Sequence, residues 1–408
     1  MKWKPAVPCL LILCAGLVVL TSCGDDKVTG PGPGEEPATL ETRIERNNEF
    51  AFELYGRLGS SDDNLMISPH SIVTAFGMAY AGARGTTERQ MAEVLSFNYP
   101  QAGFHSVLKR LNAHLTGIDG LTFSIANGCW GRDDLTYIES FLDTLSADYG
   151  AEMAYLDFVG QPEQSRATIN QWVENETGGL IDGLLPPGSI DALTYLVLAN
   201  AVYFSAEWRS KFDPDYTYSA GFKRLDGSSV PVEMMCGEGA FPYFEGNGYR
   251  ALELPYRGEK TSMLVILPDE GFFKTFEGSF DAAALDTVIT GLEETVLKPK
   301  FPKFSFMSDF DLISALKSMG MTDAFSAGAN FSGMDGVDDG VPWISTVAHK
   351  AFISVDEYGT LAAAGTGMGF SIGMWDEFEA VRPFIFVIRD IETGTILFLG
   401  RFLDPTRR

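Results

Sequence analysis

The stretch NLMISPHSIVTAFGMAYAGARGTTERQM, residues 64–91, carries the strongest fold signal in the chain. Its middle, residues 71–83, is apolar on nearly every side, and this pattern predicts a buried helix rather than a surface helix. Ser68 and Pro69 stand where a cap and a first-turn residue are expected, so capping accounts for this serine. The stretch therefore predicts a helix in the interior of a large globular unit.

Outward from this helix, the chain changes from helical to strand-like patterns. Residues 43–58 place apolar side chains at helical spacing, and two further helices are predicted at 137–150 and 165–179, each followed by Gly. Apolar or alternating runs predict strands at 194–204, 230–235, 249–256, 261–268 and on both sides of a hairpin turn at 392–394. Helices come mostly first and strands mostly last, which indicates an α+β fold with a large antiparallel or mixed sheet.

The amino-acid composition and net charge limit which kinds of molecule the protein is expected to bind. The 408 residues are 45% hydrophobic and carry a formal net charge of -25. Nucleic-acid binding through phosphate contacts needs clustered Lys and Arg, so this charge argues against it. Composition is uniform after Thr42, which indicates one large folded domain.

The N-terminus predicts export. Residues 7–20 are an apolar run behind two Lys, which is typical of a secretory signal peptide and short for a membrane span. Leu20-Thr21-Ser22-Cys23 resembles the bacterial lipobox, so Cys23 is expected to carry a lipid. We therefore expect a signal peptide at 1–22, a flexible linker at 23–41 and the folded domain at 42–408. The protein would then be anchored to the bacterial cell envelope, periplasmic or at the cell surface; secretion is the alternative.

No catalytic or metal site, and no cofactor, is predicted from the side chains. Of only four His, His105 and His114 are expected on a solvated helix face, since no third ligand is near in sequence. No nucleophile elbow surrounds Ser68. After loss of the signal peptide, Cys129 and Cys236 are the two cysteines of the folded part, and we expect them to be free, buried thiols.

Residues 356–377, DEYGTLAAAGTGMGFSIGMWDE, have features of both a loop and a strand. Gly recurs as in a loop, yet from Met368 to Met374 apolar and small residues alternate as in a half-buried strand. If the segment became a strand, Thr360 and every second residue after it would face the core.

Several blocks together resemble the serpin family in order and content. These blocks are residues 64–91, 169–186, 196–212, 301–334, 347–367 and 378–405. The resemblance covers nearly all of the chain from Glu41 to Pro405. It implies one α+β domain with three β-sheets, about nine helices and an exposed reactive-centre loop.

The resemblance also implies a function. A protease cuts the reactive loop, the N-terminal part of the loop enters the main sheet as a new strand, and the protease is trapped as a covalent acyl-enzyme. The protein would be a monomeric inhibitor that is consumed, not an enzyme, and its partner would be a target serine protease, with a cysteine protease as the alternative. The alternative is a non-inhibitory serpin that acts as a binding or chaperone-like protein.

Residue roles follow from the same resemblance. The hinge comprises Glu357, Gly359, Thr360, Ala362, Ala363, Ala364 and Gly365. Small side chains suit a segment that slides between packed strands, whereas Leu361 departs from the usual Glu. A polar cluster that must rearrange when the sheet opens comprises Ser68, Ser71, Asn200 and His349, with Trp208 at the point of loop entry.

The scissile bond can be counted in two ways. Counting from Glu357 places it after Gly373, and counting back from the C-terminal strand places it after Ile372, so Ile372, Gly373 and Met374 are candidates. No Lys or Arg lies between Thr360 and Arg382. A trypsin-like pocket would have no basic partner there, so targets of elastase, chymotrypsin or subtilisin type are expected.

Overall fold

The computed structural model describes residues 38–407 apart from 60, 98, 119–120, 152, 338–339 and 361–375. The expected signal peptide and most of the linker lie outside the described residues, and so do these predicted positions: Cys23, Ala362, Ala363, Ala364, Gly365, Ile372, Gly373 and Met374.

Ten α-helices lie in the described part of the chain, close to the number that the resemblance implied. They are α1 (Leu40–Leu58), α2 (Pro69–Tyr80), α3 (Gly85–Val94), α4 (Gln101–Thr116), α5 (Glu139–Thr144), α6 (Pro162–Glu176), α7 (Phe273–Glu277), α8 (Ala282–Gly291), α9 (Leu312–Met319) and α10 (Ser332–Asp335). A π-helical turn, η1 (Leu145–Tyr149), continues α5, and two 3-10 turns are η2 (Pro214–Tyr216) and η3 (Asp323–Phe325).

The first helix begins slightly earlier than expected. Thr39 and Thr42 form a capping box, in which the Thr42 amide donates to the Thr39 hydroxyl (3.2 Å) and the Thr39 amide to the Thr42 hydroxyl (3.1 Å). This reciprocal pair satisfies two amides at the helix start. Helix α1 therefore includes Leu40 and Glu41, the last two residues of the predicted linker.

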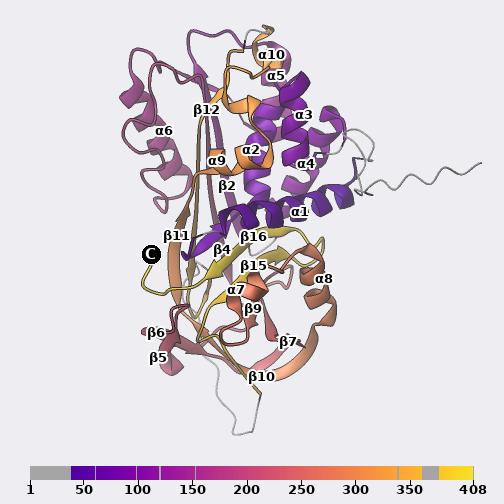
Figure 1. Cartoon of the computed structure of the whole chain (residues 1–408), viewed down its shortest axis with the longest axis vertical. Helices are drawn as coiled ribbons and strands as arrows, with labels where there is room; N and C mark the ends of the chain where they lie inside the picture. Colours follow the sequence, from indigo (N-terminus) through magenta and orange to yellow (C-terminus); the bar gives the residue numbers. More distant parts are fainter. Residues whose placement is uncertain are drawn as a thin grey trace, which may run out of the picture.

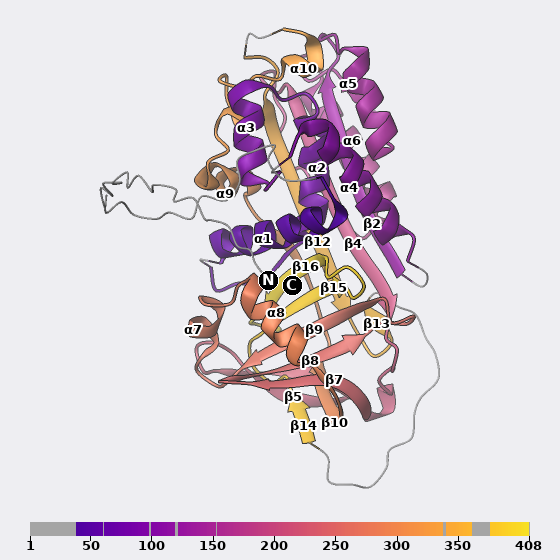
Figure 2. The ribbon, with the colours of Figure 1, turned by 90° about the vertical axis from the view of Figure 1, so that its right-hand side faces the viewer.

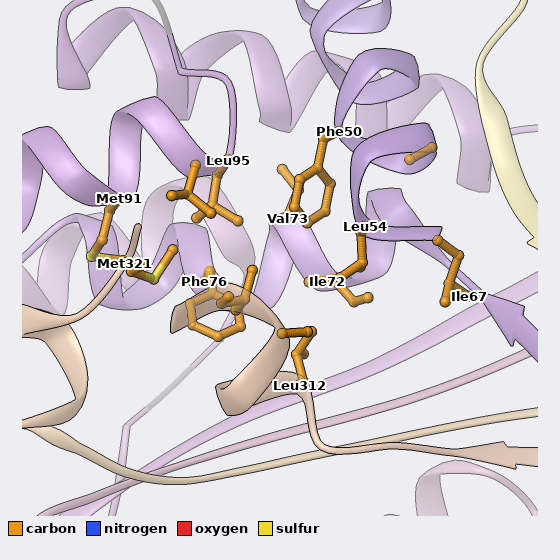
Figure 3. Packing of buried hydrophobic residues seen from close by; sticks show 14 of the residues in the cluster. Phe50, Leu54, Ile67, Ile72, Val73, Phe76, Met91, Leu95, Leu312 and Met321 are labelled. Atoms are coloured by element: carbon orange, nitrogen blue, oxygen red, sulfur yellow. The ribbon is translucent and has the colours of Figure 1, made fainter. Parts of the chain in front are cut away.

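Helix α2 is buried along its whole length, as its sequence predicts. Its apolar side chains pack among those of α1, α3 and α9 (Figure 3). Ser68 occupies the N-cap position without capping the helix, because its hydroxyl donates to the carbonyl oxygen of Leu397 (2.8 Å). Capping was thus the wrong explanation for this serine, which ties the helix start to a C-terminal strand.

A six-stranded sheet has the order β11-β12-β13-β4-β2-β3. Its strands are β2 (Leu121–Arg132), β3 (Ala154–Leu156), β4 (Leu196–Glu207), β11 (Phe304–Asp309), β12 (Ile344–Val355) and β13 (Gly359–Thr360). Along β4, Val197, Ala199 and Ala201 pack in one cluster with α6, whereas Leu196 and Leu198 belong to the core around α2. The sheet is therefore covered on both faces, by α6 on one side and by α2 on the other (Figure 1).

The other sheet follows the order β1-β16-β15-β9-β8-β7-β10-β6-β5, with β14 paired to β10 off this path. Its strands are β1 (Leu65–Ile67), β5 (Tyr218–Lys223), β6 (Ser229–Cys236), β7 (Gly239–Gly246), β8 (Tyr249–Pro255), β9 (Thr261–Pro268), β10 (Glu293–Pro302), β14 (Asp376–Glu379), β15 (Phe384–Asp390) and β16 (Ile396–Phe402). Strand β10 pairs with β7 through its first half and with β6 through its last residues. This bridging joins two of the three expected sheets into one hydrogen-bonded sheet.

None of the helices in the described residues is long and apolar enough to cross a membrane.

Candidate functional site

The site lies where β12 and β4 part. These two strands pair directly and in parallel from Ile344, opposite Leu196, to Phe352, opposite Tyr203. Beyond that point β13 lies between them, with Thr360 opposite both Val355 of β12 and Ala206 of β4. Figure 2 shows β13 at this end of the sheet. The six-stranded sheet thus already accepts two residues of the predicted hinge as an added strand.

A tight turn brings the chain from β12 back into the sheet. The Asp356 carboxylate accepts hydrogen bonds from the amides of Tyr358 (2.9 Å) and Gly359 (3.2 Å). Burial nevertheless raises the pKa of Asp356. Trp208 holds the turn from outside, because its indole nitrogen donates to the Asp356 carbonyl (2.9 Å) and its amide to the Tyr358 carbonyl (2.9 Å). Trp208 therefore contacts the turn that leads into β13, the strand that contains Gly359 and Thr360 of the predicted hinge.

Gly359 has no room for a side chain. A Cβ there would overlap the carbonyl oxygen of Ala206 and lie 2.8 Å from the Cα of Glu207. Only glycine lets the backbone approach β4 this closely.

Glu357 is a buried anion in the same turn, with only 3% of its surface exposed. Its carboxylate accepts from the hydroxyl of Thr217 (2.7 Å) and pairs with the ammonium of Lys303 (2.8 Å). Burial alone would raise the pKa of Glu357, but the hydrogen bonds from Lys303 and Thr217 outweigh it and lower the pKa. The sequence contained no spacing signal for these two partners, which come from distant parts of the chain.

Thr360 is fully buried, on the side that the alternation of the loop assigned to the core. Its hydroxyl oxygen lies 2.8 Å from that of Tyr256. The Tyr256 ring stacks on Trp208, with ring centroids 4.6 Å apart and an angle of 8° between the planes. Thr360 is thereby held by an aromatic pair, of which Tyr256 follows strand β8 of the ten-stranded sheet.

Deeper in the sheet, Asn200 links three other polar side chains. Its amide nitrogen donates to the hydroxyl (2.5 Å) and carbonyl (3.1 Å) of Ser71 in α2 and to the side-chain oxygen of Asn127. Its amide oxygen accepts from the ring of His349. Asn127 was not predicted, and Ser68 has no hydrogen bond to this group, because its hydroxyl is bonded to Leu397 instead.

His349 is buried and neutral. Burial lowers its pKa to about 3. Since an amide oxygen only accepts hydrogen bonds, the ring nitrogen Nδ1 that faces Asn200 carries the hydrogen. The centroid of the Phe310 ring lies 5.1 Å from the centroid of the His349 ring. Within the described residues the second ring nitrogen, Nε2, has no hydrogen-bond partner.

This polar group forms a row across three strands. His349 of β12 is the register partner of Asn200 in β4, and Asn200 is the register partner of Asn127 in β2. A strand that entered between β12 and β4 would move them apart by one further strand spacing, about 4.8 Å. The hydrogen bond between His349 and Asn200 would then break, whereas that between Asn200 and Asn127 could persist.

The far end of the loop is held separately. Strand β14 lies parallel to β10, and the ammonium of Lys300 binds the carboxylates of Glu377 (2.9 Å) and Glu379. The two described ends of the loop, Thr360 and β14, thus belong to different sheets.

Other predicted features differ from expectation. His105 is buried rather than solvated: its ring nitrogen lies 2.7 Å from the Tyr149 hydroxyl, and burial lowers its pKa to about 4. His114 is half-buried and lies 3.0 Å from an oxygen of Asp390. The helix that carries them packs against α1 and η1, so it has less solvated surface than its sequence suggested.

The described part of the chain contains neither a metal-binding cluster nor a disulfide between its two cysteines. No group of three His, Cys, Asp or Glu there could hold a metal ion. Cys129 and Cys236 are both free, but Cys129 is buried and Cys236 only half-buried.

Comparison with known proteins identifies a family. Residues 45–405 match the family model described as Serpin (serine protease inhibitor). An uncharacterised serpin-like protein of Thermococcus kodakarensis is 38% identical over 366 residues, which cover 88% of this chain and 84% of that protein. The leukocyte elastase inhibitor of Bos taurus is 37% identical over 381 residues, which cover 90% of this chain and 100% of that protein. Among solved structures, uncleaved ovalbumin superposes with a TM-score of 0.83 at 29% identity and covers 90% of this chain and 100% of its own.

Proposed function

The chain belongs to the serpin family, and on that premise we propose that it is an inhibitory member, acting on serine proteases by loop cleavage and insertion. A target protease attacks a bond in the loop between β13 and β14 and forms an acyl-enzyme. The part of the loop that follows Thr360 then continues β13 down the sheet, between β12 and β4. The protease is carried along and trapped, and the inhibitor is consumed.

The observation that carries this proposal is the position of β13. Thr360 already pairs with both β12 and β4, and Gly359 pairs with β4, so further insertion would extend an existing strand. The next pairs to separate are Phe352 with Tyr203 and those below them, as far as Ile344 with Leu196.

The polar row would act as a barrier to opening. Insertion past His349 costs its hydrogen bond to Asn200, because these two residues lie on the strands that separate. New pairing of the inserted strand on both of its edges offsets this cost. Lys300 holds β14 on β10 through Glu377 and Glu379. Before cleavage the loop is attached to β14, so it cannot move far enough to pair with β12 and β4. Cleavage removes this attachment.

The targets would be proteases of elastase, chymotrypsin or subtilisin type. This follows from the absence of Lys and Arg between Thr360 and Arg382. Inhibition of an elastase is also what the name of the bovine relative states for that protein.

A protease panel tests the proposal. The full chain is incubated with elastase, chymotrypsin, subtilisin and trypsin, and products are analysed by SDS gel and by mass spectrometry of the cleaved loop. An SDS-stable complex with at least one of the first three, and cleavage next to Ile372, Gly373 or Met374, is expected. Cleavage without a complex and without a gain in thermal stability would instead favour a non-inhibitory binding protein.

We also propose that the chain is exported and anchored by a lipid on Cys23, acting as a monomer outside the cytoplasm. The lipobox-like Leu20-Thr21-Ser22-Cys23 supports this. In a bacterial host that processes lipoproteins, the wild-type chain should fractionate with membranes and Cys23→Ala should not. Equal fractionation of both would contradict the anchor.

A further inference from the structure

A cavity of about 480 Å³ lies between three segments that are distant in the sequence. Residues 223–227 include the turn between β5 and β6, residues 268–274 lead from β9 into α7, and Arg382 and Pro383 precede β15. None of the described residues of the hinge, the polar row or β14 lines this cavity. The proposed inhibitory mechanism therefore gives it no role.

Most basic side chains that line the cavity already have a carboxylate partner. Three of them are paired, as Lys223 with Glu270, Lys274 with Asp62 and Arg224 with Asp404. These cations are therefore largely compensated by the protein itself.

Arg382 differs from these three. Its Nε donates to the carbonyl oxygen of Pro268 (2.9 Å), which fixes the direction of the guanidinium. Within the described part of the chain, its two terminal nitrogens have neither a hydrogen-bond partner nor an ion-pair partner. Burial, with the nearby charge of Arg250, lowers the pKa of Arg382. Asp269 and Glu270 offset this effect only in part, so the half-buried cation is incompletely compensated.

A guanidinium in this arrangement suits a carboxylate. With Nε occupied, the two terminal nitrogens of Arg382 still form a fork that can donate two parallel hydrogen bonds to one carboxylate. Because the guanidinium is already held in place, a ligand would lose little binding free energy in ordering it.

The apolar part of the wall favours an organic ligand. Four residues provide it: Leu225, Pro268, Phe273 and Pro383. The volume also lies within the range of small-molecule sites, roughly 300–1,000 Å³. A ligand with a carboxylate at one end and an apolar group at the other would match both parts of the cavity.

Acidic side chains limit the charge of the ligand. Four of them line the cavity, and they equal the basic ones in number: Asp62, Asp226, Asp269 and Glu270. A dianion such as phosphate would meet about twice the repulsion that a monoanion meets. A single carboxylate is therefore favoured over a phosphate group.

We propose that this cavity binds a small organic monocarboxylate, whose carboxylate pairs with Arg382 and whose apolar group packs against Leu225 and Phe273. A ligand there would contact all three segments, so an occupied site would stabilise the folded chain. This inference holds whether or not the chain inhibits proteases.

Phenylacetate is a suitable probe, since it carries one carboxylate and one aromatic ring. Phenylacetamide is the matched uncharged control, and inorganic phosphate is the control that lacks an apolar group. The full wild-type chain is titrated with each compound at constant ionic strength. Binding is measured by isothermal titration calorimetry and by the thermal midpoint.

Phenylacetate should bind with a Kd on the order of 1 mM. At tenfold excess over that value it should raise the thermal midpoint by about 2 °C. Phenylacetamide and phosphate should each bind roughly tenfold more weakly or less. Equal binding of the acid and the amide, binding of phosphate as tight as that of phenylacetate, or no binding of phenylacetate would each overturn the proposal.

Variants locate the site. Arg382→Gln should weaken phenylacetate binding roughly tenfold or more, because the charged partner is lost. Arg250→Gln is the matched control: Arg250 is also half-buried and donates to the Glu377 carbonyl (3.1 Å), but it does not line the cavity. It should change the affinity by less than about twofold. Equal losses in the two variants would mean that net charge, and not this cavity, governs binding.

A second variant covers the case in which Arg382→Gln does not fold. Leu225→Asp places a carboxylate at the cavity from the turn between β5 and β6, where a polar side chain is readily accommodated. It should also weaken phenylacetate binding roughly tenfold, because like charges repel. Unchanged binding in Leu225→Asp would overturn the proposed site.

Discussion

Thr360 and Tyr256 share a buried hydrogen bond, with their hydroxyl oxygens 2.8 Å apart. Thr360 is the last described residue before the reactive loop, and Tyr256 follows a strand of the ten-stranded sheet. The contact therefore joins the second residue of β13, in the six-stranded sheet, to a residue next to β8 of the ten-stranded sheet. It also places a strict limit on the side chain at position 360, since both groups are fully buried.

Replacement of this threonine by a charged residue should abolish inhibition without abolishing cleavage. In Thr360→Arg, an unpaired guanidinium would occupy the buried position of β13 at a cost of several kcal/mol, so β13 should leave the sheet and no longer be there to be extended after cleavage. We expect the protease to cut the loop and leave, so that the yield of SDS-stable complex falls about tenfold or more. Thr360→Ser, which keeps the hydroxyl, is the matched control and should retain the complex. Equal complex yields from both variants would contradict this role for the site.

Reversal of charge at Glu357 should destabilise the hinge turn. Glu357→Lys loses the bond from Thr217 and places an ammonium beside Lys303 in a nearly buried position. A fall of roughly 2–4 kcal/mol in the free energy of unfolding is expected, because an uncompensated charge remains. Glu357→Gln, which can still accept from Thr217, should lose about 1 kcal/mol. Urea unfolding monitored by Trp fluorescence distinguishes the two, and equal losses would argue against the ion pair.

The buried histidines should make the protein less stable in mild acid. Burial lowers the pKa to about 4 for His70 and His105 and to about 3 for His349, against 6.5 as the ordinary value. Between pH 6.5 and these values the unfolded chain binds protons that the folded chain does not. The stabilisation is therefore complete above pH 6.5 and is lost as pH falls, by about 1.4 kcal/mol per pH unit for each histidine.

One histidine can be separated from the others by substitution. His349→Gln should reduce the loss of stability between pH 7 and pH 5 by about a third, as should His105→Gln. Denaturant unfolding at several pH values measures this. Only His349→Gln should also change the rate of complex formation, because in the proposed mechanism His349 lies on a strand that separates from β4. An unchanged pH dependence in both variants would show that these side chains are not buried as neutral groups.

Loss of Asn200 should cost more than loss of Asn127. Asn200→Ala leaves Ser71, Asn127 and His349 without their shared partner, and about 2–4 kcal/mol of stability should disappear. Asn127→Ala removes one hydrogen bond of the same group and should cost about 1 kcal/mol. Thermal unfolding of the two variants gives the comparison. A larger effect for Asn127 would mean that Asn200 is not the centre of this network.

Much of the fold could be inferred from local pattern. The all-apolar run 71–83 predicted a buried helix, and α2 is buried throughout. The hairpin around residues 392–394 appears as β15 and β16. Such features depend on neighbours in the sequence, where apolar periodicity and turn residues act directly. The same reasoning wrongly predicted that His105 is exposed to solvent. Whether one face of a helix is buried depends on which elements pack against it in the folded chain.

The candidate site was only partly accessible to sequence reasoning. Resemblance pointed to Asn200, His349 and the hinge, but Asn127, Tyr256, Thr217 and Lys303 were missed. Each of these contacts a predicted residue from a distant segment, and no spacing in the chain encodes such a meeting. The role assigned to Ser68 also changed, since the acceptor of its hydroxyl, Leu397, comes from the last strand of the fold.

By itself the sequence determined the class of fold, the order of helices and strands and the small side chains of the hinge, because these depend on local chemistry. The tertiary structure alone decided where β13 joins the sheet: β4 and β12 are far apart in the chain, and their pairing ends at Phe352 and Tyr203. There β13 enters, held by Trp208 and by the Tyr256 hydroxyl. The physical reason is that a strand edge, a buried hydrogen bond and a buried charge each need a partner, and only the folded chain brings those partners together.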